Sequence, residues 1–194
     1  MKTLYVFTFI IAAFYAGIVS AATYNSRDVR THGDWSSLEL YLGDESFFRA
    51  INTVSYSDTT ISLDYSIDKC DSPLMVTRIN MGEIYSKSES FIKVFSSELR
   101  VDRMAIHKGS AWTSTERGDS GLYINYYFSD MDSILKDMRA GRVARIKISG
   151  DDIDDVYLEF SMSGSMAAIN RAAALCRAAS RGPASYFEDA GSSI

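Results

Sequence analysis

The sequence predicts a mainly β fold: an antiparallel, sandwich-like β domain with a short helix and a C-terminal helix packed on it. Apolar and polar residues alternate in most segments between residues 37 and 162, as they do in half-buried strands. Helical spacing occurs in two segments only, and both lie late in the chain. No internal repeat or interdomain linker interrupts residues 23–180, so we expect one β-rich globular domain there.

Four strands are expected in the first half. Residues 37–42 and 61–67 alternate leucine or isoleucine with serine and acidic residues, which predicts one buried face and one wet face. Residues 47–56 are β-branched and aromatic, and Pro73 precedes an apolar run that ends at Asn80. Proline is tolerated at the start of a strand, so this run is expected to be the fourth.

Five strands are expected in the second half. By the same criteria of alternation and β-branched content they cover residues 91–95, 99–107, 122–128, 144–148 and 156–162. The acidic segment Asp151–Asp155 is expected to form the hairpin loop between the last two strands. It lacks the ligand spacing of a calcium loop, so a solvated turn is the favoured interpretation.

Two helices complete the predicted fold. The first has an apolar face with i, i+3, i+4, i+7 spacing, formed by Met131, Ile134, Leu135 and Met138. Ser129 or Asp130 is the expected N-cap, and Gly141 is expected to be the left-handed residue after its end. The second helix, at about residues 165–180, is rich in alanine and directs Cys176 toward the core.

The two ends of the chain are predicted to lie outside this domain. Lys2, an uncharged apolar run over residues 4–19 and small residues before Ala21 and Ala22 predict that residues 1–22 are a secretory signal peptide. The run is about 16 residues long, which is short for a membrane span. Residues 181–194, which begin after the second helix with a Gly-Pro pair, are expected to form a flexible tail.

Charge and cysteine content limit the function classes. Loss of Lys2 leaves 19 of the 20 basic residues against 25 acidic ones, a balance that disfavours nucleic acid as a partner. Cys70 and Cys176 are an even count in an exported chain, which favours a disulfide, although two buried thiols remain an alternative. With His32 and His107 they lack zinc-ligand spacing, so neither a metal nor a cofactor is expected.

The segment after residue 115 contains two familiar short motifs. Arg117-Gly118-Asp119 is the tripeptide that integrins bind, and Gly118-Asp119-Ser120-Gly121 surrounds the nucleophile of trypsin-like proteases. A serine nucleophile needs a histidine base and an orienting acid, and the surroundings of His32 and His107 do not resemble those of such a base. Glycine, aspartate and serine are common in turns, so an ordinary turn is favoured and no catalytic residue is predicted.

A binding surface and an acid–base pair are the remaining candidates. Tyr123 and Tyr127 occupy the strand face opposite Ile124, and with Trp112 they are a possible binding surface. Ordinary cross-strand aromatic packing is the favoured alternative. For a hydrolase, Asp102 and Glu116 are the candidate acid and base.

The segment from Leu99 to Cys176 resembles a known protein type. It contains an Arg-Val-Asp strand, a Gly-Arg pair after the short helix, and Phe160-Ser-Met-Ser-Gly-Ser165 before the alanine-rich helix with its cysteine. This layout resembles Gram-negative periplasmic proteins of the invasion-associated locus B type, and type VI secretion-associated accessory proteins. The resemblance implies a periplasmic β-sandwich whose C-terminal helix is fixed by a Cys70–Cys176 disulfide. It does not imply a defined enzymatic activity, and it supplies no catalytic residue.

The expected function is therefore that of an exported, non-enzymatic binding or accessory protein of the periplasm or cell envelope. Its partner would be a protein of the envelope, the secretion machinery or a host, and no membrane span is expected after cleavage. The alternatives are an envelope-polymer hydrolase that uses carboxylates and a periplasmic immunity or inhibitor protein.

Overall fold

The structure, a computed structural model, describes residues 24–52, 54 and 59–180. The predicted signal peptide and C-terminal tail lie outside these residues. The described chain contains ten strands and two helices. Their bounds are β1 Asn25–His32, β2 Trp35–Leu42, β3 Glu45–Asn52, β4 Thr59–Ser66, β5 Leu74–Asn80, β6 Glu89–Val101, β7 Ile106–Thr115, β8 Gly121–Phe128, α1 Met131–Ala140, β9 Val143–Gly150, β10 Ile153–Ser161 and α2 Ser165–Ser180.

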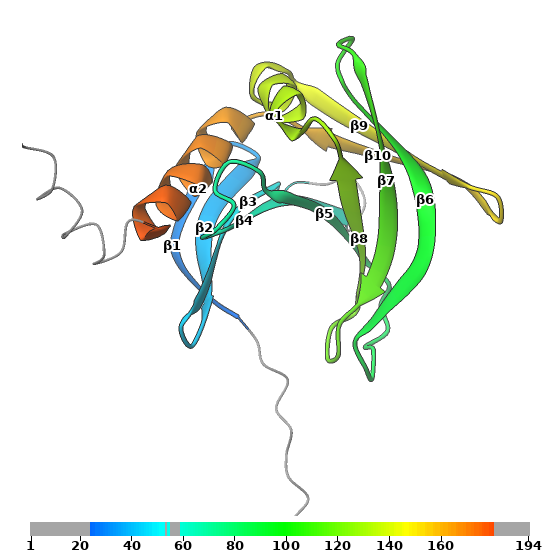
Figure 1. The fold of residues 1–194 in the computed structure, drawn as a ribbon, viewed down its shortest axis with the longest axis horizontal. Helices are drawn as coiled ribbons and strands as arrows, with labels where there is room; N and C mark the ends of the chain where they lie inside the picture. The colour runs from blue at the N-terminus through cyan, green and yellow to red at the C-terminus, as the bar shows by residue number, and fades with distance from the viewer. Residues whose placement is uncertain (1–23, 53, 55–58, 181–194) are drawn as a thin grey trace, which may run out of the picture.

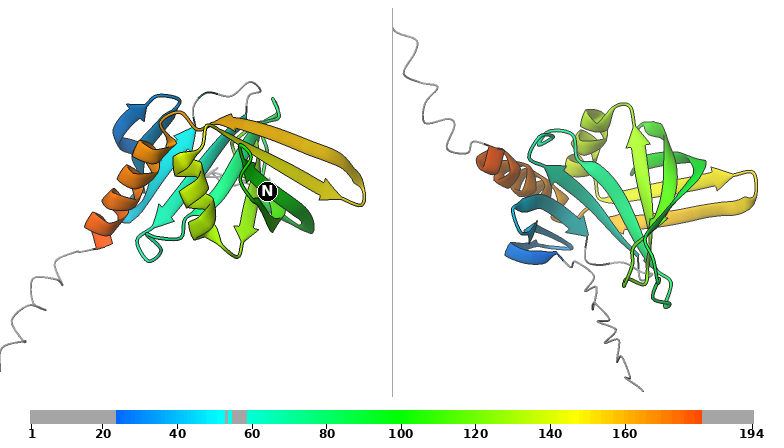
Figure 2. Two further views of the ribbon diagram at one scale, coloured as in Figure 1. Left: turned by 90° about the horizontal axis from the view of Figure 1, so that it is seen from above. Right: turned by 60° about the horizontal axis from the view of Figure 1, so that its bottom comes forward.

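All ten strands belong to one antiparallel sheet, in the order β1-β2-β3-β4-β5-β8-β7-β6-β9-β10. The sheet curves strongly, with β2–β4 and β6–β8 on opposite sides of an open space that β5 crosses (Figure 1). Figure 2 shows both helices on the outer side of this curve. The expected mainly β fold with a C-terminal helix is confirmed. One continuous curved sheet forms its β part.

The hydrophobic core lies between the sheet and the two helices. α1 contacts α2, which packs on β1–β4. The core contains Phe48, Leu63 and Tyr65 from the sheet together with Ile169 and Cys176 from α2. The alanine-rich face of α2 brings the helix close to β2 and β3, because short side chains keep two packed elements near each other. Neither α1 nor α2, the two helices of the described residues, packs across the opposite, concave face of the sheet (Figure 2).

Trp35 anchors one end of this core. Its ring is fully buried, and its indole N–H donates to the carbonyl oxygen of Ser161 at 2.8 Å. The amide of Asn52 donates to the same carbonyl at 2.9 Å. These bonds join β2 and β3 to the end of β10, which is distant in sequence, and satisfy polar groups that would be costly to bury alone.

Both predicted helices are present, with one difference at a terminus. α2 occupies the residues expected for it, and Asp130 caps α1 by accepting from the backbone N–H of Ser133 at 3.0 Å. Gly141 is extended, with φ −92°, and is not the predicted left-handed residue. A glycine is needed there for space, because a Cβ would lie 2.1 Å from Cγ1 of Val101.

The predicted strand over residues 99–107 is wrong, because a turn divides it. β6 ends at Val101, and β7 starts at Ile106. Asp102 has a φ of 47°, and its carboxylate accepts from the backbone N–H groups of Arg142 and Val143 at 2.9 and 3.1 Å. The strand predicted over residues 91–95 is the first part of β6, which runs on to Val101.

Two further features of the sheet also differ from the predictions. β1 was not predicted, although it forms one edge of the sheet beside β2. The acidic hairpin loop is shorter than predicted, since β10 already begins at Ile153.

Gly164, in the Ser-Gly-Ser segment before α2, allows a close backbone approach. Its φ is +88°, and a Cβ at this position would lie 1.4 Å from the carbonyl oxygen of His32. The adjacent carbonyl of Ser163 accepts from the backbone N–H of Asp34 at 3.0 Å. The β1–β2 turn is therefore packed directly on the start of α2, and only glycine fits there.

Within the ranges that the structure describes, neither helix combines the length and apolar character needed to cross a bilayer.

Candidate functional site: a cavity on the concave face

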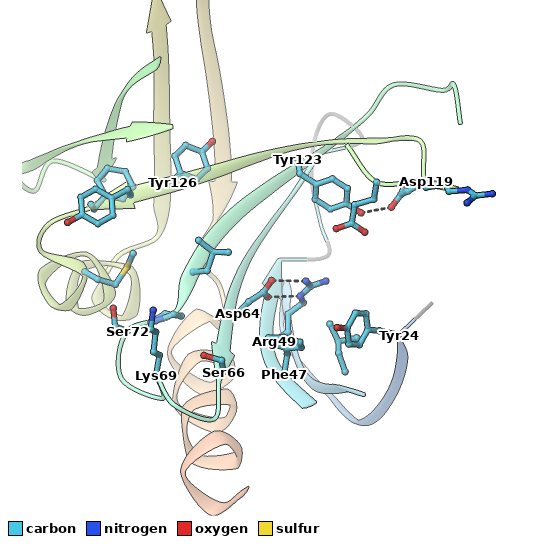
Figure 3. A pocket seen from close by; sticks show the side chains of 18 of the residues that line it. Tyr24, Phe47, Arg49, Asp64, Ser66, Lys69, Ser72, Asp119, Tyr123 and Tyr126 are labelled. Carbon is cyan, nitrogen blue, oxygen red and sulfur yellow. Dashed lines mark hydrogen bonds and ion pairs between the residues drawn. The ribbon is translucent and has the colours of Figure 1, made fainter. Parts of the chain in front are cut away.

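The concave face of the sheet contains a half-open cavity of about 1010 Å³. Strand register directs side chains from β3, β4 and β8 to this face, with Arg49 opposite Asp64 and Tyr123 opposite Arg78. Figure 3 shows how these side chains surround the cavity. The lining combines aromatic, aliphatic, hydroxyl and charged groups: Tyr24, Leu40, Phe47, Arg49, Asp64, Ser66, Lys69, Ser72, Pro73, Leu74, Ile84, Glu116, Arg117, Gly118, Asp119, Ser120, Tyr123, Tyr126, Tyr127, Phe128 and Met131.

An ion pair lies at the middle of the cavity. Nε and the Nη2 atom of Arg49 donate to the two carboxylate oxygens of Asp64 at 2.6 and 2.7 Å. The Arg49 side chain is 30% exposed and the Asp64 side chain is 15% exposed. Burial lowers the pKa of Arg49, but the charge and hydrogen bonds of Asp64 outweigh it and raise that pKa overall. The two opposite charges therefore neutralise each other, and the bidentate hydrogen bonds hold both side chains in position.

A second network fixes the side of the cavity formed by the β7–β8 turn. Asp119 accepts from the Arg78 guanidinium, from the Tyr123 hydroxyl and, at 2.8 Å, from the backbone N–H of Gly121. The bond from Arg78, with those from Tyr123 and Gly121, lowers the pKa of Asp119 to about 2. The aspartate of the integrin-type tripeptide is thus engaged inside its own domain and remains ionised at neutral pH.

Apolar side chains form the walls. The rings of Tyr24 and Phe47 meet edge to face, with centroids 5.7 Å apart. Of the other lining residues, Tyr127 is 65% exposed and Leu74 is 43% exposed. Uncovered aromatic and aliphatic groups in a hollow are typical of a binding site, because a ligand that covers them removes apolar surface from water.

The β4–β5 loop closes one end of the cavity and is tied to α2. The Cys70–Cys176 disulfide joins them with a Cα–Cα distance of 5.5 Å, which confirms the predicted pairing. Arg177 of α2 also donates to Asp71 at 3.0 Å. Lys69, the residue before the loop cysteine, lines the cavity, so the disulfide holds part of the cavity wall.

The predicted binding residues share a sheet face but differ in their surroundings. Trp112 pairs with Asn125, which places it on the same face as Tyr123 and Tyr127. Both tyrosines line the cavity, whereas Trp112 does not. The bond from its hydroxyl to Asp119 holds Tyr123 in the wall, and burial together with that bond raises the pKa of Tyr123 to about 12. Tyr127 is the exposed member of the set.

The structure separates the residues proposed for catalysis. Asp102 precedes β7 and Glu116 follows it, so the two carboxylates lie at opposite ends of a ten-residue strand. The hydroxyl of Ser120 donates to the side-chain oxygen of Asn80 at 2.9 Å. Within the described chain, His32 contacts Ser37 and His107 contacts Asp137, so neither pairs with Ser120.

No group of three or more histidine, cysteine, aspartate or glutamate residues in the described ranges is arranged to hold a metal ion. In the acidic hairpin, Asp152 pairs with Lys93, and Asp155 pairs with Lys147 at 2.9 Å. These carboxylates are therefore engaged in surface ion pairs.

Sequence reasoning missed Phe47, Arg49, Asp64 and Lys69 as site residues. The available signal was alternation: Arg49 and Asp64 are charged residues within predicted strands, on the faces opposite their apolar neighbours. Strand order shows that those two faces are adjacent, and the curvature of the sheet places β8 across from them (Figure 1).

Neither a protein-family model nor a curated protein sequence matches the chain. Among solved structures, the fold is similar to invasion associated protein B from Bartonella henselae, with a TM-score of 0.50 and 16% identity. The match covers 76% of this chain and 96% of that one. The resemblance to the invasion-associated type therefore holds at the level of the fold, whereas the type VI secretion resemblance remains a prediction.

Proposed function

We propose that this chain is an exported, non-enzymatic accessory protein that binds a partner protein through the concave face of its sheet. The observation that carries the proposal is the cavity, where exposed apolar walls surround the neutralised Arg49–Asp64 ion pair and the Arg78–Asp119 pair holds one side. Apolar surface drives association, and fixed polar groups give it orientation and specificity.

The state of two of the three cavity carboxylates, Asp64 and Asp119, favours binding over hydrolysis. A general acid must hold a proton near neutral pH, which requires a raised pKa. Asp119 has its pKa lowered to about 2, and Asp64 is paired through both oxygens with Arg49. Both carboxylates are thus suited to hold the walls in position.

Three features support an exported location. The first 22 residues have the composition of a signal peptide, and a disulfide joins β4–β5 to α2. Disulfides persist mainly in oxidising compartments such as the bacterial periplasm. The fold is also that of an invasion-associated bacterial protein. We propose the periplasm or cell envelope as the location, with a partner from the envelope, the secretion machinery or a host.

Paired tyrosine variants test this proposal. Tyr127 lies in the cavity and Tyr157 lies on β10 outside it, and both are highly exposed, at 65% and 69%. Each is changed to serine, and each variant is compared with wild type for co-elution with envelope proteins in size-exclusion chromatography.

Tyr127→Ser is expected to weaken retention of a specific protein about fivefold or more, because a central aromatic anchor contributes over 1 kcal/mol. Tyr157→Ser is expected to retain it. The proposal is contradicted if Tyr127→Ser retains the protein as well as wild type does, or if an envelope polymer is cleaved at a rate that depends on Asp64.

A further inference from the structure

We infer that the cavity takes an extended segment of the partner protein that carries a carboxylate, and that this carboxylate pairs with Lys69 while apolar side chains contact Tyr127 and Phe47. The inference rests on the proposed function and specifies the chemistry of its partner.

Charge defines the end of the cavity that attracts a carboxylate. Arg49 is neutralised by Asp64, and Asp119 by Arg78. At the β7–β8 turn, Glu116 and Arg117 both line the cavity and add no net charge to it, whereas Asp68, the residue before Lys69, does not line it. Within the described residues the ammonium of Lys69 has no acidic partner within ion-pair distance, and it stands near Ser66 and Ser72 (Figure 3).

The centre of the cavity requires an occupant with hydrogen-bonding groups. Arg49 and Asp64 lie between the Lys69 end and the end formed by Tyr24 and Asp119 (Figure 3). An alkyl chain laid over this ion pair would remove its remaining water and offer no hydrogen bond in exchange, which is costly. A peptide backbone supplies an N–H and a carbonyl at each residue, so it replaces that water.

The walls favour a peptide over a glycan. Leu40, Leu74, Ile84 and Met131 are aliphatic groups that match apolar side chains. Asp64 and Asp119, two of the three carboxylates that could bind sugar hydroxyls, already hold arginines. β3, β4, β5 and β8 each pair with a strand on both sides, so a segment in the cavity has no free strand edge to join. Recognition must therefore come from side chains.

Backbone ¹⁵N–¹H NMR titration of the disulfide-intact protein tests the inference. The probes are the peptide N-acetyl-Ala-Leu-Ala-Phe with a free C-terminal carboxylate and the same peptide as its C-terminal amide. Decanoate and a tetramer of N-acetylglucosamine represent the lipid and glycan alternatives. Lys69→Gln is the test variant, and Lys136→Gln on α1, exposed and outside the cavity, is its control.

The free-acid peptide is expected to shift signals at Leu74 and Tyr127 and to bind about three- to fivefold more tightly than the amide, as an exposed ion pair allows. Lys69→Gln should abolish that preference, and Lys136→Gln should preserve it.

Equal affinity for acid and amide, a preference that survives Lys69→Gln, or cavity shifts with decanoate or the glycan alone would each overturn the inference. If neither peptide binds but partner retention still depends on Tyr127, the inference fails and the proposed function stands. If retention also fails to depend on Tyr127, both fail.

Discussion

Removal of the Cys70–Cys176 disulfide is expected to lower the free energy of unfolding substantially. The bond joins residues separated by 106 positions. In the chain-entropy model, freeing a loop of that length lets the unfolded chain regain about 5 kcal/mol at 25 °C. The native state loses little contact of its own, because Arg177 still pairs with Asp71 and the apolar face of α2 remains packed on the sheet.

The perturbation is the double variant Cys70→Ala/Cys176→Ala, and the assay is urea denaturation followed by circular dichroism. We expect a loss of about 3 to 5 kcal/mol, since disulfides often contribute less than the model value. Wild type reduced by a phosphine should show a similar loss, because both changes remove the same link. A loss below about 1 kcal/mol in both would refute the view that this bond fixes α2 and the cavity loop.

Three other perturbations follow from the geometry. Gly164→Ala should lower the free energy of unfolding, measured by urea denaturation, by well over 2 kcal/mol, because a Cβ there meets a backbone carbonyl at 1.4 Å. Gly43 has a similar positive φ but open space around it, so Gly43→Ala should lower it by about 1 kcal/mol. Equal losses in the two variants would contradict this reasoning. Arg49→Met and Asp64→Asn should each lower the free energy of unfolding by about 1 to 3 kcal/mol, and the double variant should lose less than the sum of the two single losses. Strictly additive losses would show that the two side chains are not coupled. The pKa of the Asp119 carboxyl is lowered from 3.8 to about 2, so wild type should be more stable than Asp119→Asn above pH 4 and should lose that advantage as the pH falls toward 2. A stability difference that does not change with pH would count against the Arg78–Asp119–Tyr123 network.

Local signals made the helices and most strands predictable. The spacing of Met131, Ile134, Leu135 and Met138 and the alanines of α2 define helices without tertiary information. β1 escaped prediction because seven of its eight residues are exposed, so it has no apolar alternation to detect. Its place is set by pairing with β2 and by contacts with α2.

The strand error and the missed site have tertiary causes. Val101 continues an alternating pattern, but the Asp102 carboxylate bonds to backbone groups some 40 residues later and fixes a turn that no local pattern shows. Similarly, alternation places Arg49, Asp64 and Tyr123 on polar strand faces one at a time. The curvature of the sheet and the order β3-β4-β5-β8 bring those faces around one cavity.

Site-specific photo-crosslinking tests the central claim, that the concave face binds a partner protein, most directly. A benzophenone amino acid replaces Tyr127 or Leu74 in the cavity, or Tyr157 or Lys136 outside it, and irradiated cells are examined for covalent adducts by mass spectrometry. We predict that the two cavity positions capture the same protein and the two outer positions do not. Adducts at the outer positions with none in the cavity would contradict the account.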